Sequence, residues 1–124
     1  MSAELNALSA CAASELIARG KLSAVELTQA CLARIAAREP DIHAWAYLDP
    51  EQALAQARRC DASKPQTALH GLPVGIKDVI DTCDMPTAYG SAIYEGNRPR
   101  WDAACVNALR AAGAIVMGKT VRSE

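Results

Sequence analysis

The sequence predicts an α/β fold in which helices cover a mixed, partly parallel sheet. Stretches with apolar residues at helical spacing alternate along the chain with shorter strand-like runs. A helix-like stretch at 102–113 lies between the strand-like runs 74–79 and 114–118, and this order is typical of a crossover between parallel strands. Hydrophobic residues make up 51% of the chain without any Phe. The core is therefore expected to consist mostly of Ala, Leu, Ile and Val, which suits helices packed closely on a sheet.

Residues 1–39 are predicted to form a helical hairpin. The first helix covers about 9–19 and ends at Gly20, a residue type that commonly terminates helices. The second helix begins at Ser23–Glu26, which has the pattern of a capping box, and is expected to stop just before Pro40. A partner-binding hairpin is the functional alternative, but packing of both helices on their own domain is the simpler interpretation.

Residues 40–124 are predicted to begin the α/β core. Small or aliphatic residues alternate with larger ones over 42–48, which indicates a strand. His43 in this run has no second metal ligand nearby in the sequence, so we interpret it as a surface or hydrogen-bonded histidine. Asp49–Gln52 then offers an N-cap, a proline at the first helical position and an acidic first turn for a third helix.

A long connection at 82–100 combines Pro, Gly and hydroxyl residues without clean periodicity. Long ordered loops are often functional, so this segment is a candidate wall of a site, with a plain surface loop as the equal alternative. Asp102 is expected to cap a fourth helix that ends at Gly113, and 114–118 to form a short buried strand. Because this strand looks central, we expect residues 1–124 to be the N-terminal segment of a larger fold.

Composition and charge exclude several classes of function. The chain has 124 residues, enough for one ordinary domain, and its 13 basic and 14 acidic residues give a formal charge of −1. This balance does not favour binding to nucleic acid or to an anionic membrane. The first residues lack the pattern of a signal peptide, and no apolar run approaches the ~18 residues needed to cross a bilayer.

The cysteines predict neither a disulfide framework nor a zinc site. There are five, an odd number, spaced at least twenty residues apart and without a C-x-x-C pair. The simplest interpretation is small buried hydrophobes in a reducing cytoplasm rather than reactive thiols. We therefore expect a cytoplasmic protein without a metal or a cofactor.

Lys77 is the candidate catalytic residue because it stands alone in an otherwise apolar, strand-like run. Strand alternation divides this run into two faces, Val74, Ile76 and Asp78 on one and Gly75, Lys77 and Val79 on the other. Gly75 has no side chain, so another backbone or a substrate could approach the amine closely.

A catalytic role would require an altered pKa at Lys77. To accept a proton at neutral pH, the pKa of the amine must fall from ~10.4 toward ~7, which means about 4 to 5 kcal/mol of destabilisation of the ammonium form. Burial against Val74, Ile76 and Val79 is expected to supply part of this. A snorkelling or salt-bridged lysine is the commoner alternative when the chemistry is considered alone.

The motifs around this lysine resemble those of the amidase signature hydrolases. His70–Asp78 looks like the lysine motif of the family, Met85–Ser91 looks like its following loop, and 102–120 looks like the next helix and strand. The resemblance covers nearly the whole chain, including the helix start at Leu22–Leu27. Several matched motifs in the right order make Lys77 a catalytic candidate rather than a structural lysine.

The resemblance implies covalent acyl transfer onto a serine. In this family a serine nucleophile attacks an amide carbonyl, a second serine in a cis peptide relays its proton, and the lysine is the ultimate base. Of these three residues only the lysine has a counterpart here, Lys77. The Gly-Ser-rich segment with both serines and the oxyanion amides is implied to lie beyond Glu124, and neither Ser91 nor Ser123 has that context.

We therefore expect the N-terminal segment of an amidase that acts on a small-molecule amide but is inactive as residues 1–124 alone. Stand-alone, malonamidase-like members are the most similar. The alternative within the family is the amidase subunit of glutamyl-tRNA amidotransferase, and the alternative from another class is a non-catalytic module that binds a partner. A homodimer is left open.

Overall fold

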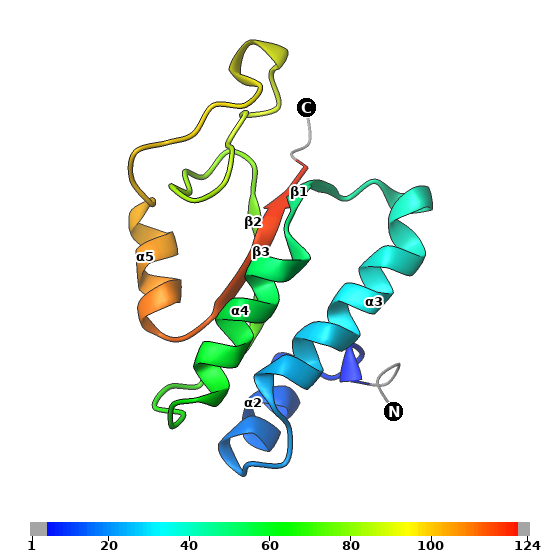
Figure 1. The fold of residues 1–124 in the computed structure, drawn as a ribbon, viewed down its shortest axis with the longest axis vertical. Helices are drawn as coiled ribbons and strands as arrows, with labels where there is room; N and C mark the ends of the chain where they lie inside the picture. Colours follow the sequence, from blue (N-terminus) through cyan, green and yellow to red (C-terminus); the bar gives the residue numbers. More distant parts are fainter. Residues whose placement is uncertain (1–4, 122–124) are drawn as a thin grey trace.

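The computed structural model describes residues 5–121 and shows a three-stranded sheet with helices around it (Figure 1). In chain order the elements are α2 Ala10–Ala18, α3 Ala24–Ile42, β1 Trp45–Leu48, α4 Pro50–Asp61, β2 Pro73–Lys77, the 3₁₀ helix η1 Ala92–Tyr94, α5 Ala104–Ala111 and β3 Ile115–Thr120.

The strand β3 is the centre of the sheet. It pairs antiparallel with β1 and parallel with β2. Because α5 lies between β2 and β3 in the chain, the two parallel strands are joined by the predicted crossover. The predicted fold class, a mixed and partly parallel sheet covered by helices, is confirmed.

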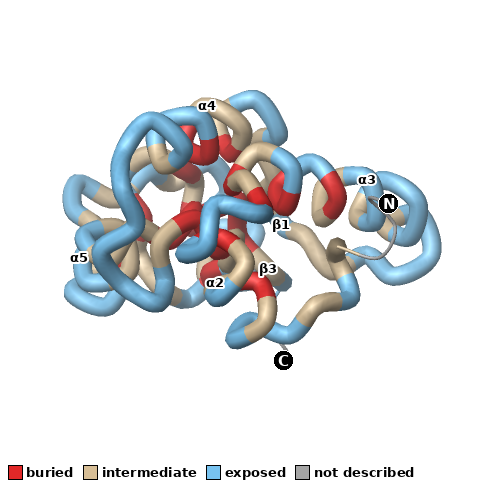
Figure 2. Tube along the Cα trace, turned by 90° about the horizontal axis from the view of Figure 1, so that it is seen from below, coloured by how far each residue is buried: buried red, intermediate tan, exposed pale blue. Residues whose placement is uncertain are grey.

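Two apolar clusters cover the two faces of the sheet. On one face α3 and α4 pack on β3 through Ala24, Ala53, Ala57, Ile115 and Met117. On the other face α5 and the loop after β2 pack through Ile76, Met85, Val106 and Val116. Figure 2 shows the buried residues gathered in the middle of the molecule, with exposed turns and loops around them.

The starts of α2 and α3 follow from local side-chain chemistry, and both predictions are confirmed. Ser9 is the N-cap of α2, and its Oγ accepts a hydrogen bond from the Ala12 amide at 3.1 Å. Ser23 and Glu26 form the complete capping box at the start of α3. A tertiary contact adds to the α3 cap, because the carboxylate of Asp61 at the end of α4 also accepts hydrogen bonds from the first two amides of α3.

The end of α3 differs from the prediction, because the helix continues through Pro40 for two further residues. A proline removes one amide donor, and so close to the helix end this loss affects only the last turn. His43 then takes a left-handed conformation with φ 52° and donates its N–H to the Glu39 carbonyl at 2.9 Å. The Glu39 carboxylate accepts hydrogen bonds from the amides of Ala44 and Trp45, both at 2.9 Å. The strand predicted from residue 42 therefore begins at Trp45.

Gln56 connects α4 directly to the central strand. Its Nε2 donates to the Val116 carbonyl at 3.0 Å, and its Oε1 accepts from the Val116 amide at 3.1 Å. The ladder between β1 and β3 covers only residues 118–120 of β3. The Gln56 side chain thus satisfies the backbone of Val116, where β1 no longer pairs.

Gly118 allows β1 to lie against β3. A Cβ atom at this position would be 2.2 Å from the carbonyl oxygen of Tyr47 and 3.1 Å from the Cα of Leu48. Any other residue would have to push the two strands apart. The glycine in the middle of β3 is therefore required by close backbone packing.

The expectation that Asp102 caps α5 is wrong. The N-cap is Ala103, which makes no side-chain capping bond. Asp102 is instead held by tertiary partners: its Oδ1 accepts from the Cys83 amide at 2.8 Å and its Oδ2 lies 3.1 Å from Arg110 Nε. The carboxylate that could have capped the helix is thus engaged by a neighbouring segment of the chain.

The expectation that all cysteines are buried is also wrong. The five cysteines are free, but Cys11, Cys83 and Cys105 are exposed, and only Cys31 and Cys60 are partly buried. Cys11 and Cys105 lie on helices whose buried positions are other residues, Ala13 and Ile17 in α2 and Val106 in α5.

Candidate functional site

Lys77 is the last residue of β2, an edge strand, and it is exposed. In the parallel ladder it lies opposite Thr120 of β3. The predicted alternation is confirmed by burial, since Gly75, Lys77 and Val79 are exposed whereas Val74, Ile76 and Asp78 are partly or fully buried. The lysine therefore points away from the apolar cluster beneath β2.

The expectation that Val74, Ile76 and Val79 bury this lysine is wrong. Val74 and Ile76 pack with Met85 on the opposite face of the sheet. Val79 is on the same face as Lys77 but is 45% exposed. Within residues 5–121, Lys77 therefore lies at an open strand end rather than in an apolar pocket.

The face of β2 that carries Lys77 is covered next to Gly75 by side chains. A Cβ on Gly75 would lie 2.9 Å from Thr120 Cγ2 and 3.0 Å from Trp45 Cη2. Because glycine has no side chain, the indole of Trp45 in β1 and the methyl group of Thr120 in β3 can pack against Gly75. Thr120 is also the ladder partner of Lys77.

Asp78 follows Lys77 directly and has the opposite environment. It is 5% exposed, and its amide donates to the Thr120 carbonyl at 2.9 Å, which continues the strand ladder. Its Oδ1 accepts from the Ala88 amide at 3.3 Å and lies 3.5 Å from Lys119 Nζ. The carboxylate therefore faces a second lysine rather than Lys77.

Lys119 is a buried cation that the sequence interpretation missed. Its side chain is completely buried, and Nζ donates to Thr87 Oγ1 at 2.5 Å besides facing Asp78. Burial lowers the pKa of Lys119, and this is the largest influence, while the neighbouring carboxylates, Asp78 first, act in the opposite direction. The only local signal is that Lys119 follows the apolar run of β3, a position that by itself indicates the polar end of a strand.

The loop that follows β2 is ordered by its own polar contacts. Tyr89, with φ 56°, donates its hydroxyl to Asp81 Oδ1 at 2.5 Å and meets the ring of Tyr94 edge-on, with ring centres 5.4 Å apart. The hydrogen bond to Asp81 is the largest of the influences that raise the pKa of Tyr89. Thr87 donates its amide to the Asn97 carbonyl at 2.8 Å. The loop therefore has a defined shape at the strand end that carries Lys77.

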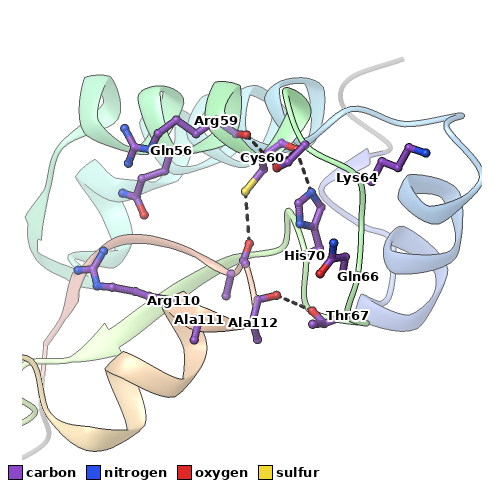
Figure 3. Close-up of a pocket in the computed structure, with 13 residues that line it drawn as sticks. Gln56, Arg59, Cys60, Lys64, Gln66, Thr67, His70, Arg110, Ala111 and Ala112 are labelled. Atoms are coloured by element: carbon purple, nitrogen blue, oxygen red, sulfur yellow. Dashed lines mark hydrogen bonds between the residues drawn. The ribbon is translucent and has the colours of Figure 1, made fainter.

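A hollow of about 490 Å³ lies at the other end of the parallel strands. Its lining includes Cys60, near the end of α4, and His70, shortly before β2 (Figure 3). Gly113, shortly before β3, also belongs to the lining. His70 Nε2 contacts the Cys60 carbonyl at 2.9 Å, and Cys60 Sγ donates to the Gly113 carbonyl at 3.4 Å. These hydrogen bonds connect the segments that line the hollow. Lys77 does not belong to the lining.

Metal clusters and membrane-spanning helices are both absent from the described part of the chain. Residues 5–121 contain no group of three or more His, Cys, Asp or Glu side chains that could hold a metal ion. Over the same range, no helix combines the length and the apolar character that a membrane span needs.

Comparison with known proteins identifies relatives for nearly the whole chain. A subunit of the glutamyl-tRNA(Gln) amidotransferase of Chloroflexus aggregans is 48% identical over 120 residues, which is 94% of this chain and 25% of that protein. The peptide amidase of Stenotrophomonas maltophilia is 38% identical with a TM-score of 0.83 over 90% of this chain and 24% of its own. An amidase family protein of Bacillus anthracis is 29% identical with a TM-score of 0.86 over 96% of this chain and 25% of its own.

The chain thus spans about a quarter of the length of these relatives. The sequence model of the amidase family matches residues 26–124, which include β1, β2, β3 and Lys77. The resemblance stated from the motifs around Lys77 is confirmed at the level of the family and of the fold. This chain belongs to the amidase family.

Proposed function

We propose that this chain supplies the catalytic lysine of an amide-hydrolysing enzyme. Membership of the amidase family supports the reaction class. The observation that carries the proposal for the residue is the position of Lys77: an exposed amine at the end of β2, next to a loop with a defined shape. The loop 82–100 is proposed as one wall of the site.

The proposed chemistry follows the serine mechanism expected from the motifs. A serine outside this chain attacks the amide carbonyl, and its proton passes through the relay serine to the neutral Lys77 amine. The tetrahedral intermediate then collapses, the C–N bond breaks, and the protonated lysine helps to return the proton to the leaving amine. Water subsequently hydrolyses the acyl-serine ester.

A chimeric enzyme tests this proposal. Residues 1–124 would replace the matching quarter of the Stenotrophomonas maltophilia peptide amidase, and hydrolysis of a peptide amide would be measured. We expect an active chimera in which Lys77→Ala lowers kcat by about 10³-fold or more, as for members of catalytic triads. The matched control is Lys64→Ala, since Lys64 is an exposed lysine in the linker after α4.

Two results would contradict the proposal. One is a near-normal rate for Lys77→Ala in an active chimera. The other is amide hydrolysis by residues 1–124 alone that Lys77→Ala abolishes, because the isolated chain is proposed to be inactive.

A second candidate is the amidase subunit of a glutamyl-tRNA(Gln) amidotransferase. It is favoured by the 48% identity to the amidotransferase subunit of Chloroflexus aggregans. To test it, residues 1–124 would replace the matching quarter of that protein, and amide transfer to glutamyl-tRNA(Gln) would be assayed in the assembled amidotransferase. Restored transfer in this host, together with an inactive peptide amidase chimera, would favour the second candidate over the first.

Further expectations remain predictions. A cytoplasmic location is supported by the exposed free thiols of Cys11, Cys83 and Cys105, which suit a reducing compartment. The division into a helical hairpin, 1–39, and the start of the core, 40–124, and the possibility of a homodimer are likewise retained as predictions.

A further inference from the structure

Lys119 is the largest fully buried side chain among the described residues. Burying an ammonium group carries a large desolvation penalty unless good partners compensate for it. A replacement by apolar residues of similar size is often as stable as a buried ion pair. The arrangement around Lys119 therefore calls for an explanation other than stability.

The partners of Lys119 come from two other segments of the chain. Nζ donates to Thr87 Oγ1 at 2.5 Å, in the loop after β2, and lies 3.5 Å from Asp78 Oδ1, at the end of β2. The same Oδ1 accepts the Ala88 amide at 3.3 Å. A single cation on β3 thus ties the end of β2 to the loop.

This cluster lies one residue away from Lys77 along the chain. Asp78 is anchored on both sides, by its carboxylate to Lys119 and by its amide to the Thr120 carbonyl at 2.9 Å. Immediately afterwards the Ile80 amide donates to the Lys77 carbonyl at 3.0 Å, which closes the turn. The backbone that carries the Lys77 side chain is therefore fixed from the buried face of the sheet.

Lys119 itself is not placed to react with a substrate. It lies opposite Ile76 in the ladder and shares the buried environment of Asp78, whereas Lys77 lies opposite Thr120 and its side chain is exposed. Its position is suited to holding neighbouring groups rather than to accepting a proton from a substrate.

We propose that Lys119 is a positioning residue, whose contacts with Asp78 and Thr87 hold the end of β2 and the adjoining loop so that the Lys77 amine is aimed at the reacting atoms. The positioning part of this inference rests on the proposed catalytic role of Lys77. The ordering of the strand end and loop does not depend on that role.

Amide hydrogen exchange on the chain tests the ordering. In Lys119→Met the Thr87 and Ala88 amides are expected to exchange at least about tenfold faster, while the Gly71 and Ile115 amides at the other end of the strands change less than about twofold. Thr87→Val removes the hydroxyl that accepts from Lys119 and that also lies 3.4 Å from Thr82 Oγ1. It is the second variant in case Lys119→Met does not fold, and it should show the same pattern.

The matched control for Thr87→Val is Thr28→Val. Thr28 is also completely buried, but its hydroxyl has no hydrogen-bond partner among the described residues. It lies on α3, away from the strand end. Its replacement should leave the Thr87 and Ala88 amides unchanged. Unchanged exchange of the Thr87 and Ala88 amides in both Lys119→Met and Thr87→Val would overturn the proposal.

The positioning is tested in the peptide amidase chimera. Lys119→Met and Thr87→Val are expected to lower kcat at least about tenfold, with KM within about threefold, and to shift the pH dependence of kcat, because the base is displaced while the remaining substrate contacts stay. Faster exchange without a change in kcat would overturn the positioning role. Failure of the proposed function is distinguishable, because Lys77→Ala would then leave kcat unchanged.

Discussion

Lys77 and Lys119 lie near the same end of the sheet and show how position in a strand decides the chemistry of a lysine. Lys77 is exposed at the end of an edge strand, whereas Lys119 lies in the central strand and is buried. Of the two amines, only that of Lys119 is shielded from water within residues 5–121. The free energy that this burial costs can be measured through its dependence on pH.

Lys119 is predicted to make the chain relatively more stable at alkaline pH. Its pKa in the folded chain is lowered from 10.5, so the unfolded chain binds more protons between these two values, and stability rises with pH in this window. Below the folded pKa the cost of burying the ammonium is present in full. The free energy of unfolding of the natural chain should therefore increase relative to Lys119→Met as the pH rises toward 10.5.

Urea unfolding from neutral pH up to pH 10.5, the ordinary pKa of lysine, in the presence of a reductant would measure this difference. Burial also raises the pKa values of the thiols of Cys31 and Cys60, so these groups add to the pH dependence of stability in both proteins. Their contributions cancel in the comparison of the two proteins. The control is Lys64→Met at an exposed position, for which the difference should not vary with pH. A Lys119→Met difference as flat as this control would contradict the prediction.

The two lysines also show what can be inferred from sequence at this scale. Lys77 stands out because it interrupts an apolar run and belongs to a recognisable motif. Lys119 follows such a run after Gly118, and this position predicts only the polar end of a strand. Its burial depends on the loop segment around Thr87, 32 residues away in the sequence, and this contact leaves no local pattern.

Among the elements, helix starts are predictable where the capping groups are local. Ser9, Ser23 and Asp49 each accept a hydrogen bond from an amide three residues later, so the motif is visible in a short stretch. Pro40 and Asp102 mislead because the deciding partners are groups outside the capping motif. The Glu39 carboxylate supports the chain after α3, and Arg110 and the Cys83 amide hold Asp102.

No sequence pattern predicts the role of Gln56, yet we expect its side chain to be essential for the packing of α4 on β3. Gln56→Leu would leave the amide and the carbonyl of buried Val116 without their partner. Because an unsatisfied buried polar group costs about 1–3 kcal/mol, we expect a loss of about 2–4 kcal/mol in the free energy of unfolding.

Urea unfolding at neutral pH would measure this loss. The matched control is Gln29→Leu, at an exposed position of α3, which should change stability by no more than about 0.5 kcal/mol. Equal effects of the two substitutions would show that the contact between Gln56 and the Val116 backbone does not stabilise the fold.

For the whole molecule, the order of helices and strands can be read from periodicity, and the crossover between β2 and β3 follows from it. The antiparallel pairing of β1 with the other edge of β3 cannot be read from periodicity. Strand order depends on contacts between residues 45–48 and 118–120, which are distant in sequence. The open strand end around Lys77 is likewise a property of the whole arrangement. Local hydrophobicity alone predicts a buried amine there.

The stability of β3 in residues 1–124 alone distinguishes an independently stable module from a segment that needs the rest of an amidase. β3 is paired on both edges, and five of its six residues are buried. In addition, α4 holds its backbone through Gln56. We therefore expect the amides of residues 116–119 to exchange most slowly in the chain, because they open only when the sheet itself comes apart. The exposed linker 62–66 is the internal reference for fast exchange. Exchange of 116–119 as fast as this reference would mean that the sheet is not stable in residues 1–124 alone, and that the strand end around Lys77 needs further amidase segments to become ordered.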